Sequence, residues 1–83
     1  MAFKKIYFFE IFDAAGNLVC KSEQYEGYLN TRESLFLYMT GYENESTAFI
    51  YRVLRNGKIG EERRFILKNN TVVEFGLLKP KVV

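Results

Sequence analysis

The sequence predicts an α+β domain in which one short helix packs on one face of a mainly antiparallel, five-stranded sheet. The expected order of elements is strand, strand, helix, strand, strand, strand. Turn residues recur between short apolar runs, and one segment of helical length separates the second run from the third. A hydrophobic fraction of 48% and an aromatic fraction of 17% indicate a folded globular chain. Because the chain has 83 residues, we expect a single compact domain over residues 1–83.

The first strand is expected in the run KKIYFFEIFD, residues 4–13. A strand alternates its side chains between two faces, and both faces of this one are apolar. Phe3, Tyr7, Phe9 and Ile11 share one face, and Ile6, Phe8 and Phe12 share the other. Asp13 and Gly16 then predict a hairpin loop, because Asp accepts hydrogen bonds from nearby amides and Gly adopts left-handed conformations. The second strand follows at residues 18–20.

One helix is expected between the second and third strands. Asn30 is the predicted N-cap, Glu33 completes a capping box, and Gly41 marks the C-terminal end. Residues 31–40, TRESLFLYMT, place Leu35, Phe36 and Met39 on one side at helical spacing. A helix this short needs tertiary packing for stability, so we expect it to lie across the sheet. Residues 42–46 are a polar connection.

Two further hairpins are expected after the helix. Asn56-Gly57 is the signature of a two-residue type I′ turn, and Asn69-Asn70 is a weaker form of it. The first turn would pair Arg55 with Lys58, Leu54 with Ile59, Val53 with Gly60, Arg52 with Glu61 and Tyr51 with Glu62. The second would pair Leu67 with Val72, Ile66 with Val73 and Arg64 with Phe75.

These registers divide the side chains between two faces of the sheet. The face expected to form the core under the helix carries Phe49, Tyr51, Val53, Ile66, Val73, Phe75 and Leu77. The opposite face carries Ile50, Arg52, Leu54, Ile59, Glu61, Arg63, Phe65, Leu67 and Val72. One short helix covers one face only. The other face is therefore either buried by curling of the sheet into a half-barrel or left exposed for a partner.

Catalysis is not expected from this sequence. The chain contains no histidine, which excludes the commonest general base and the Ser-His and Cys-His nucleophile pairs. Cys20 is the single cysteine, so neither an intramolecular disulfide nor a cysteine metal site is expected. Asp13, the single aspartate, is assigned to a turn, while Glu61 and Glu62 point to opposite faces of a strand. We therefore expect no enzyme activity, no metal and no cofactor.

Charge is unevenly distributed along the chain. Residues 1–45 hold four Lys/Arg and seven Asp/Glu, a net charge of −3, whereas residues 46–83 hold eight and three, a net charge of +5. The hairpin 49–65 interleaves Arg52, Arg63 and Arg64 with aromatic residues, a pattern that fits single-stranded nucleic acid or RNA. However, Glu61 and Glu62 lie among these arginines and favour pairing within the sheet.

Protein binding is the function that the sequence favours, with nucleic-acid binding by hairpin 49–65 as the alternative. A compact, aromatic-rich domain without a catalytic set is a format typical of small inhibitors or adaptors from phages and mobile elements. A homodimer is also expected, because a small domain is short of interior. No membrane segment or targeting signal is visible, so a cytoplasmic location is expected. The candidate partner-binding residues are Tyr7, Phe8, Tyr25, Tyr28, Tyr42, Glu43, Glu45, Arg52, Arg63, Arg64 and Phe65.

Overall fold

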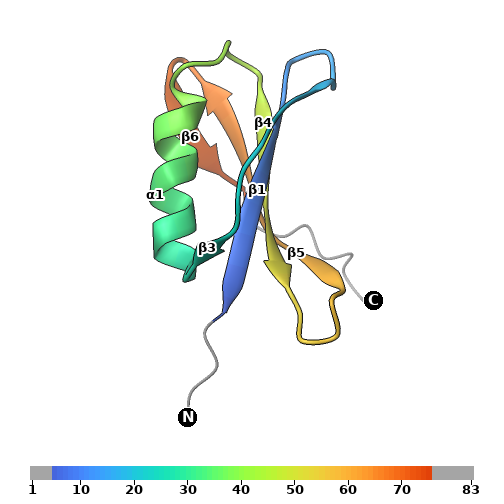
Figure 1. Cartoon of the computed structure of the whole chain (residues 1–83). Coiled ribbons are helices and arrows are strands. Elements are labelled where there is room, and N and C mark those ends of the chain that lie inside the picture. The colour runs from blue at the N-terminus through green and yellow to red at the C-terminus, as the bar shows by residue number, and fades with distance from the viewer. Residues whose placement is uncertain (1–4, 76–83) are drawn as a thin grey trace, which may run out of the picture.

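The computed structural model describes residues 5–75, which form one antiparallel sheet with one helix packed against it (Figure 1). The predicted α+β fold class and the order of its main elements are confirmed. The structure adds one short strand that the sequence did not indicate. The elements are β1 (Ile6–Phe12), β2 (Leu18–Lys21), β3 (Tyr25–Glu26), α1 (Tyr28–Met39), β4 (Thr47–Val53), β5 (Ile59–Lys68) and β6 (Thr71–Glu74).

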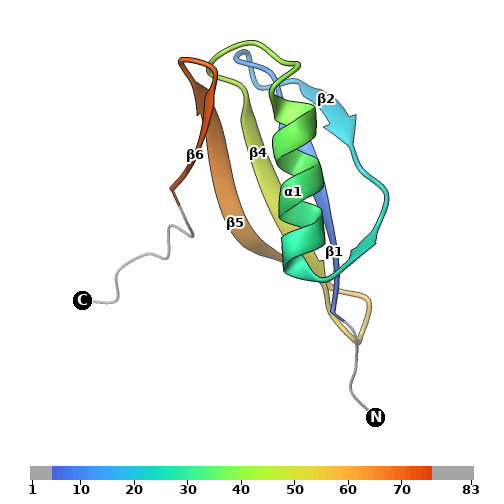
Figure 2. The same ribbon diagram turned by 90° about the vertical axis from the view of Figure 1, so that its left-hand side faces the viewer.

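The strands lie in the order β2-β1-β4-β5-β6, and β3 pairs with β1 beyond the end of β2. The chain leaves β3 into α1 and returns to place β4 beside β1, in an antiparallel register that runs from Ile6 opposite Val53 to Phe12 opposite Thr47. β4 is therefore the middle strand of the sheet. Helix α1 lies on one face, where it contacts β1, β3 and β4, while β5 and β6 extend to one side of it (Figure 2).

The first hairpin forms as its sequence predicts. Asp13 Oδ1 accepts hydrogen bonds from the backbone amides of Ala15 at 3.0 Å and Asn17 at 2.8 Å, and Gly16 has a φ of 92°. These bonds, chiefly the one from Asn17, lower the pKa of Asp13. Strand β3, which follows, has only two residues and pairs with β1 at Ile6 and Tyr7. A strand of that length carries too little alternation to be recognised in a sequence.

The helix begins at Tyr28, so the predicted capping box at Asn30 and Glu33 is wrong. Gly27, with a φ of 84°, precedes the first turn, and no side chain caps it. Asn30 instead lies inside the helix and donates from Nδ2 to the carbonyl of Glu26 at 2.9 Å. Leu35 and Met39 are buried and Phe36 packs against the core, as expected. Gly41 follows the C-terminal end and donates from its amide to the carbonyl of Tyr38 at 3.1 Å.

The core lies on the face that was expected to be uncovered. Its buried residues are Tyr7, Phe9, Ile11, Leu35, Met39, Ala48, Ile50, Phe65 and Leu67. Phe49, Tyr51 and Val53 point to the opposite side, where Val73 and Phe75 also remain exposed. The expected core face is therefore reversed; Phe3 and Leu77 lie outside the described residues. The reason is that both faces of β1 are apolar, so the pattern could not decide which one α1 would cover. The small side chain of Ala48, fully buried, faces the helix side of the central strand.

The middle hairpin has a different register from the predicted one. Leu54 donates from its amide to the carbonyl of Lys58 at 2.8 Å, and Gly57, not Asn56, has positive φ, at 84°. The turn is therefore one residue longer than a type I′ turn, and it pairs Val53 with Ile59 and Tyr51 with Glu61. A β-bulge after this point pairs Ile50 with Arg63 and leaves Glu62 as the extra residue.

The third hairpin has the predicted pairs. Leu67 lies opposite Val72 and Ile66 opposite Val73. Asn69 and Asn70 have positive φ values of 50° and 62°, as a type I′ turn requires.

Candidate functional site on the outer sheet face

The sheet face opposite α1, here called the outer face, is not covered by any helix or strand of residues 5–75 (Figure 1). β2 and β6 stay at opposite ends of the strand order, so the sheet within residues 5–75 is open at both edges. Three central strands supply most of the outer face, in register across the sheet. These side chains are Ile6, Phe8, Glu10 and Phe12 from β1, Val53, Tyr51, Phe49 and Thr47 from β4, and Ile59, Glu61, Arg64 and Ile66 from β5.

Four aromatic rings form a continuous row across the middle of the outer face. Phe12 meets Phe49 edge to face, with ring centroids 5.7 Å apart. Phe49 stacks on Tyr51 at 6.2 Å, and Tyr51 stacks on Phe8 at 5.1 Å. Each of these distances lies in the range in which aromatic pairs attract one another. This aromatic row, Phe8, Tyr51, Phe49 and Phe12, is therefore a preorganised apolar cluster, in which Phe8 is 6% exposed and the other three rings are half-buried.

Charged groups of both signs flank the aromatic row. Lys21 Nζ lies 5.6 Å from the ring centroid of Phe8, and the guanidinium of Arg64 lies 5.4 Å from that of Phe49. Arg64 also pairs with Glu61, its Nε bonding to Oε2 and its Nη2 donating to Oε1 at 3.3 Å. On the other side of the row, burial and the carboxylate of Glu10 raise the pKa of Tyr51 to about 12.

Exposed aliphatic and aromatic groups extend the outer face toward its edges. Ile59 is 56% exposed, and Leu18, which pairs with Phe12, is 52% exposed. At the other edge Val73 and Phe75 are 42% and 41% exposed. Single exposed apolar residues are ordinary, but these join the aromatic row into one contiguous surface. This surface is therefore a candidate interaction site.

Two of the sequence-predicted site residues, Phe8 and Arg64, lie on the outer face. Tyr7 and Phe65 are buried in the core on the other side of the sheet. The predicted tyrosines also lie on the helix side. Tyr25 stacks on Phe9 at 6.1 Å, Tyr28 meets Tyr7 edge to face at 5.8 Å, and Tyr42 packs against the core.

The remaining predicted residues are dispersed. Glu43 Oε2 accepts a hydrogen bond from the amide of Ala14 at 3.3 Å, and Glu45 adopts a φ of 74° in the loop before β4. Arg52 and Arg63 point to the helix side, where Arg63 Nε lies 3.2 Å from Glu74 Oε2. The structure therefore does not gather Arg52, Arg63 and Arg64 into one basic surface.

The sequence analysis did not select most of the outer face as a site. It assigned Phe49 and Tyr51 to the core, and it did not connect Glu10 and Lys21 with any surface. The available signal was the second apolar set of the first strand, Ile6, Phe8 and Phe12, because an apolar strand face is expected to be buried against other side chains. Locating the site required knowing which face α1 covers.

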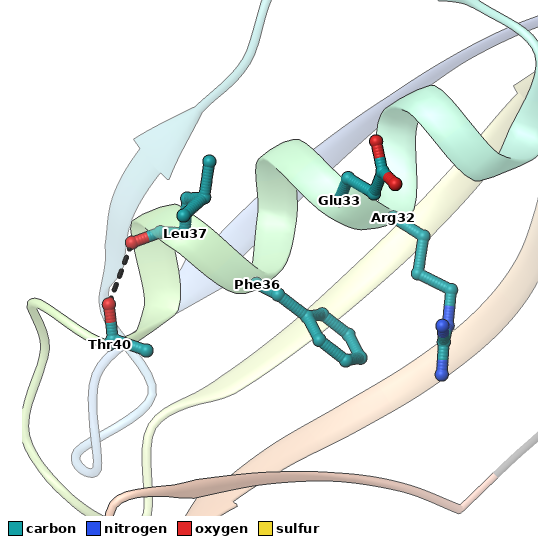
Figure 3. A pocket seen from close by; sticks show the side chains of 5 residues that line it. All are labelled: Arg32, Glu33, Phe36, Leu37 and Thr40. Atoms are coloured by element: carbon teal, nitrogen blue, oxygen red, sulfur yellow. Dashed lines mark hydrogen bonds between the residues drawn. The ribbon is translucent and has the colours of Figure 1, made fainter.

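A second candidate is a hollow along helix α1, about 440 Å³ in volume (Figure 3). It is lined by Arg32, Glu33, Phe36, Leu37 and Thr40. The guanidinium of Arg32 lies over the Phe36 ring at 4.5 Å and its Nε is 3.8 Å from Glu74 Oε1, so its charge is already partnered. Leu37 is 76% exposed at the rim. The hollow has a single-helix lining and no convergent polar groups, which makes it a weaker candidate than the outer face.

Within residues 5–75, no group of three or more His, Cys, Asp or Glu side chains is placed to hold a metal ion. The described part of the chain also has no helix of the length and apolarity needed to cross a membrane. Cys20 is a half-buried free thiol.

Comparison with known proteins gives no relative: no family model, no curated protein and no solved structure matches this chain.

Proposed function

We propose that this chain is a non-enzymatic protein-binding domain, of the inhibitor or adaptor kind, that engages another protein through its outer face. The observation that supports the proposal is the aromatic row, four rings in mutual contact on a sheet face that no element of residues 5–75 covers. Aromatic side chains dominate the energetics of protein interfaces because they bury large areas at low entropic cost. Mixed charges around such a centre are the usual composition of an interface rim.

The charge of the outer face favours a protein over a nucleic acid. Lys21 and Arg64 are balanced by Glu10 and Glu61, and Arg64 is committed to Glu61. Stacking of bases on an aromatic sheet normally accompanies a positively charged groove that follows the phosphates. The carboxylates of this face would repel phosphates, and Arg63, on the other face, is paired with Glu74.

The non-enzymatic part of the proposal rests on the residues that catalysis needs. The chain has no histidine. On the outer face the carboxylate of Glu61 is paired with an arginine, and Glu10 contacts the Tyr51 hydroxyl. General acid–base catalysis needs a group whose pKa lies near the operating pH. We propose that these two carboxylates hold neighbouring side chains in place and do not act as such a group.

The test is affinity capture from cells that contain the protein, with Phe49→Asp as the probe and Leu37→Asp as the control. Phe49 is at the centre of the aromatic row, whereas Leu37 is an exposed leucine on the far side of the molecule, so both changes add the same charge. Circular dichroism establishes that both variants are folded. A target captured by the wild type and Leu37→Asp, resistant to nuclease and lost with Phe49→Asp, is the expected result. A target lost on nuclease treatment, or retained by Phe49→Asp, refutes the proposal.

A further inference from the structure

We infer that a second copy of this chain packs face to face against the outer face. The two copies are related by a two-fold axis that lies between the two sheets and parallel to β4. The inference rests on the proposed function in one respect, that the outer face binds protein, and it names the partner. A two-fold interface requires a surface that is complementary to itself.

The topology provides the symmetry that such an axis needs. β4 is the middle strand of β2-β1-β4-β5-β6. Rotation about an axis along β4 therefore places β1 of one copy against β5 of the other, and β2 against β6. Phe49 and Tyr51 of each copy then meet their own counterparts at the centre. The aromatic row becomes the middle of the interface, where energetically dominant side chains are concentrated.

Several apolar side chains meet apolar side chains under this rotation. Each pairing follows from the observed register across the sheet. Ile6 and Ile59 lie on either side of Val53 in the sheet, so Ile6 of one copy faces Ile59 of the other. Phe12 and Ile66 flank Thr47 and meet in the same way. At the edges, Leu18 pairs with Phe12 and Val73 pairs with Ile66, which places Leu18 against Val73.

Charged side chains meet charges of the opposite sign. Glu10 and Arg64 both pair with Phe49, from opposite sides, so the rotation sets Glu10 of each copy against Arg64 of the other. Phe8 and Glu61 flank Tyr51, so Glu61 of the second copy lies over Phe8, where Lys21 Nζ is already 5.6 Å from the ring centroid. Glu10 and Arg64 therefore each find an opposite charge across the interface, whereas Lys21, which pairs with Glu10, lies opposite Phe75, whose amide bonds to the carbonyl of Arg64.

The outer face is of the order of size that a small dimer interface needs. β1, β4 and β5 supply four rows each and β2 and β6 supply two rows each, with about 4.8 Å between strands and about 6.7 Å between rows. The flat footprint is therefore about 500 Å². A standard interface buries about 800 Å² per partner. Sheets packed face to face in this way lie about 10 Å apart, as in a β-sandwich.

Sedimentation equilibrium at micromolar concentration tests the dimer. The expected mass is twice 9.8 kDa for the wild type and for Leu37→Asp, and 9.8 kDa for Phe49→Asp. A folded wild-type chain that is monomeric would overturn the inference. So would a dimer that survives Phe49→Asp or dissociates with Leu37→Asp.

A charge exchange tests the position of the axis. Glu10→Arg alone and Arg64→Glu alone each set like charges against one another, so each should weaken dimerisation at least tenfold. The double variant restores opposite charges and should recover most of the affinity, provided that Glu10 and Arg64 face one another across the axis. A double variant that is no tighter than either single variant would overturn the proposed axis. A monomeric wild type would still allow the capture experiment with Phe49→Asp, so failure of the dimer and failure of the proposed function are distinguishable.

Discussion

Replacing one phenylalanine on each face of the sheet separates the core from the interaction surface. Phe65 is fully buried and meets Phe36 edge to face at 5.5 Å, whereas Phe49 lies half-buried in the aromatic row. Truncating a buried phenylalanine to alanine costs about 3–5 kcal/mol, because it removes apolar contacts and leaves a cavity. Phe49→Ala should cost about 1–2 kcal/mol, since an aromatic pair contributes about 0.5–1.5 kcal/mol and solvent can fill the space.

The assay is equilibrium unfolding in urea followed by far-ultraviolet circular dichroism. A domain of 83 residues has a total stability of about 4–12 kcal/mol, so Phe65→Ala alone could unfold the chain. Phe65→Leu keeps most of the volume and should cost about 1.5 kcal/mol, and Phe49→Leu at the half-buried position should cost less, so this matched pair keeps the comparison measurable. The measurement is repeated at two protein concentrations a hundredfold apart, because a dimer makes the midpoint depend on concentration. If Phe49→Ala costs more than Phe65→Ala in the dilute limit, the assignment of the core to the helix side is refuted.

Three further outcomes follow from particular groups. The pKa of Tyr51 is about 12 in the folded chain and 10.0 in the unfolded one, so its contribution to stability is complete below pH 10 and is lost as the pH rises toward 12. Two pKa units correspond to about 2.7 kcal/mol, and solvent screening of this part-exposed group reduces the expected loss of stability to about 1 kcal/mol. The measurement is the difference in free energy of unfolding between the wild type and Tyr51→Phe, followed from pH 9 to pH 11.5. Gly57→Ala should lower the free energy of unfolding by about 1 kcal/mol because φ is 84°, while Gly60→Ala, with ordinary φ and open space at Cβ, should not lower it. A labelled single-stranded oligonucleotide should show no anisotropy change with micromolar protein at physiological salt, and tight, salt-sensitive binding would favour the nucleic-acid alternative.

Local signals in the sequence predicted those elements that depend on a few neighbouring residues. The Asp13 loop and the Asn69-Asn70 turn form as expected because their side chains and backbone angles act within a few residues. Leu35 and Met39 marked the buried side of the helix correctly. These features follow from chemistry that does not depend on the rest of the fold.

Other features required information that no local pattern carries. The dipeptide Asn56-Gly57 fits both a two-residue turn and a longer one with Gly57 in the left-handed region, and the structure has the longer one. The start of α1 at Tyr28 depends on Gly27 and on the pairing of β3 with β1, not on a capping side chain. The bulge at Glu62 then restores the alternation that the longer turn had shifted.

The location of the candidate site was hidden because both faces of the sheet have core-like side chains. In β1 the set Tyr7, Phe9 and Ile11 is no more apolar than the set on the other face. A helix of 12 residues covers one set, while in the other set Phe8 is buried and Ile6 and Phe12 are half-buried. A sequence selected only to fold alone would place polar residues on that second face, as antiparallel sheets with one solvated face do. The aromatic row departs from that pattern in β1 and β4. The opposite charges of Glu10 and Arg64 also lie on either side of β4. We propose that a single requirement accounts for both departures, namely burial of the outer face against protein.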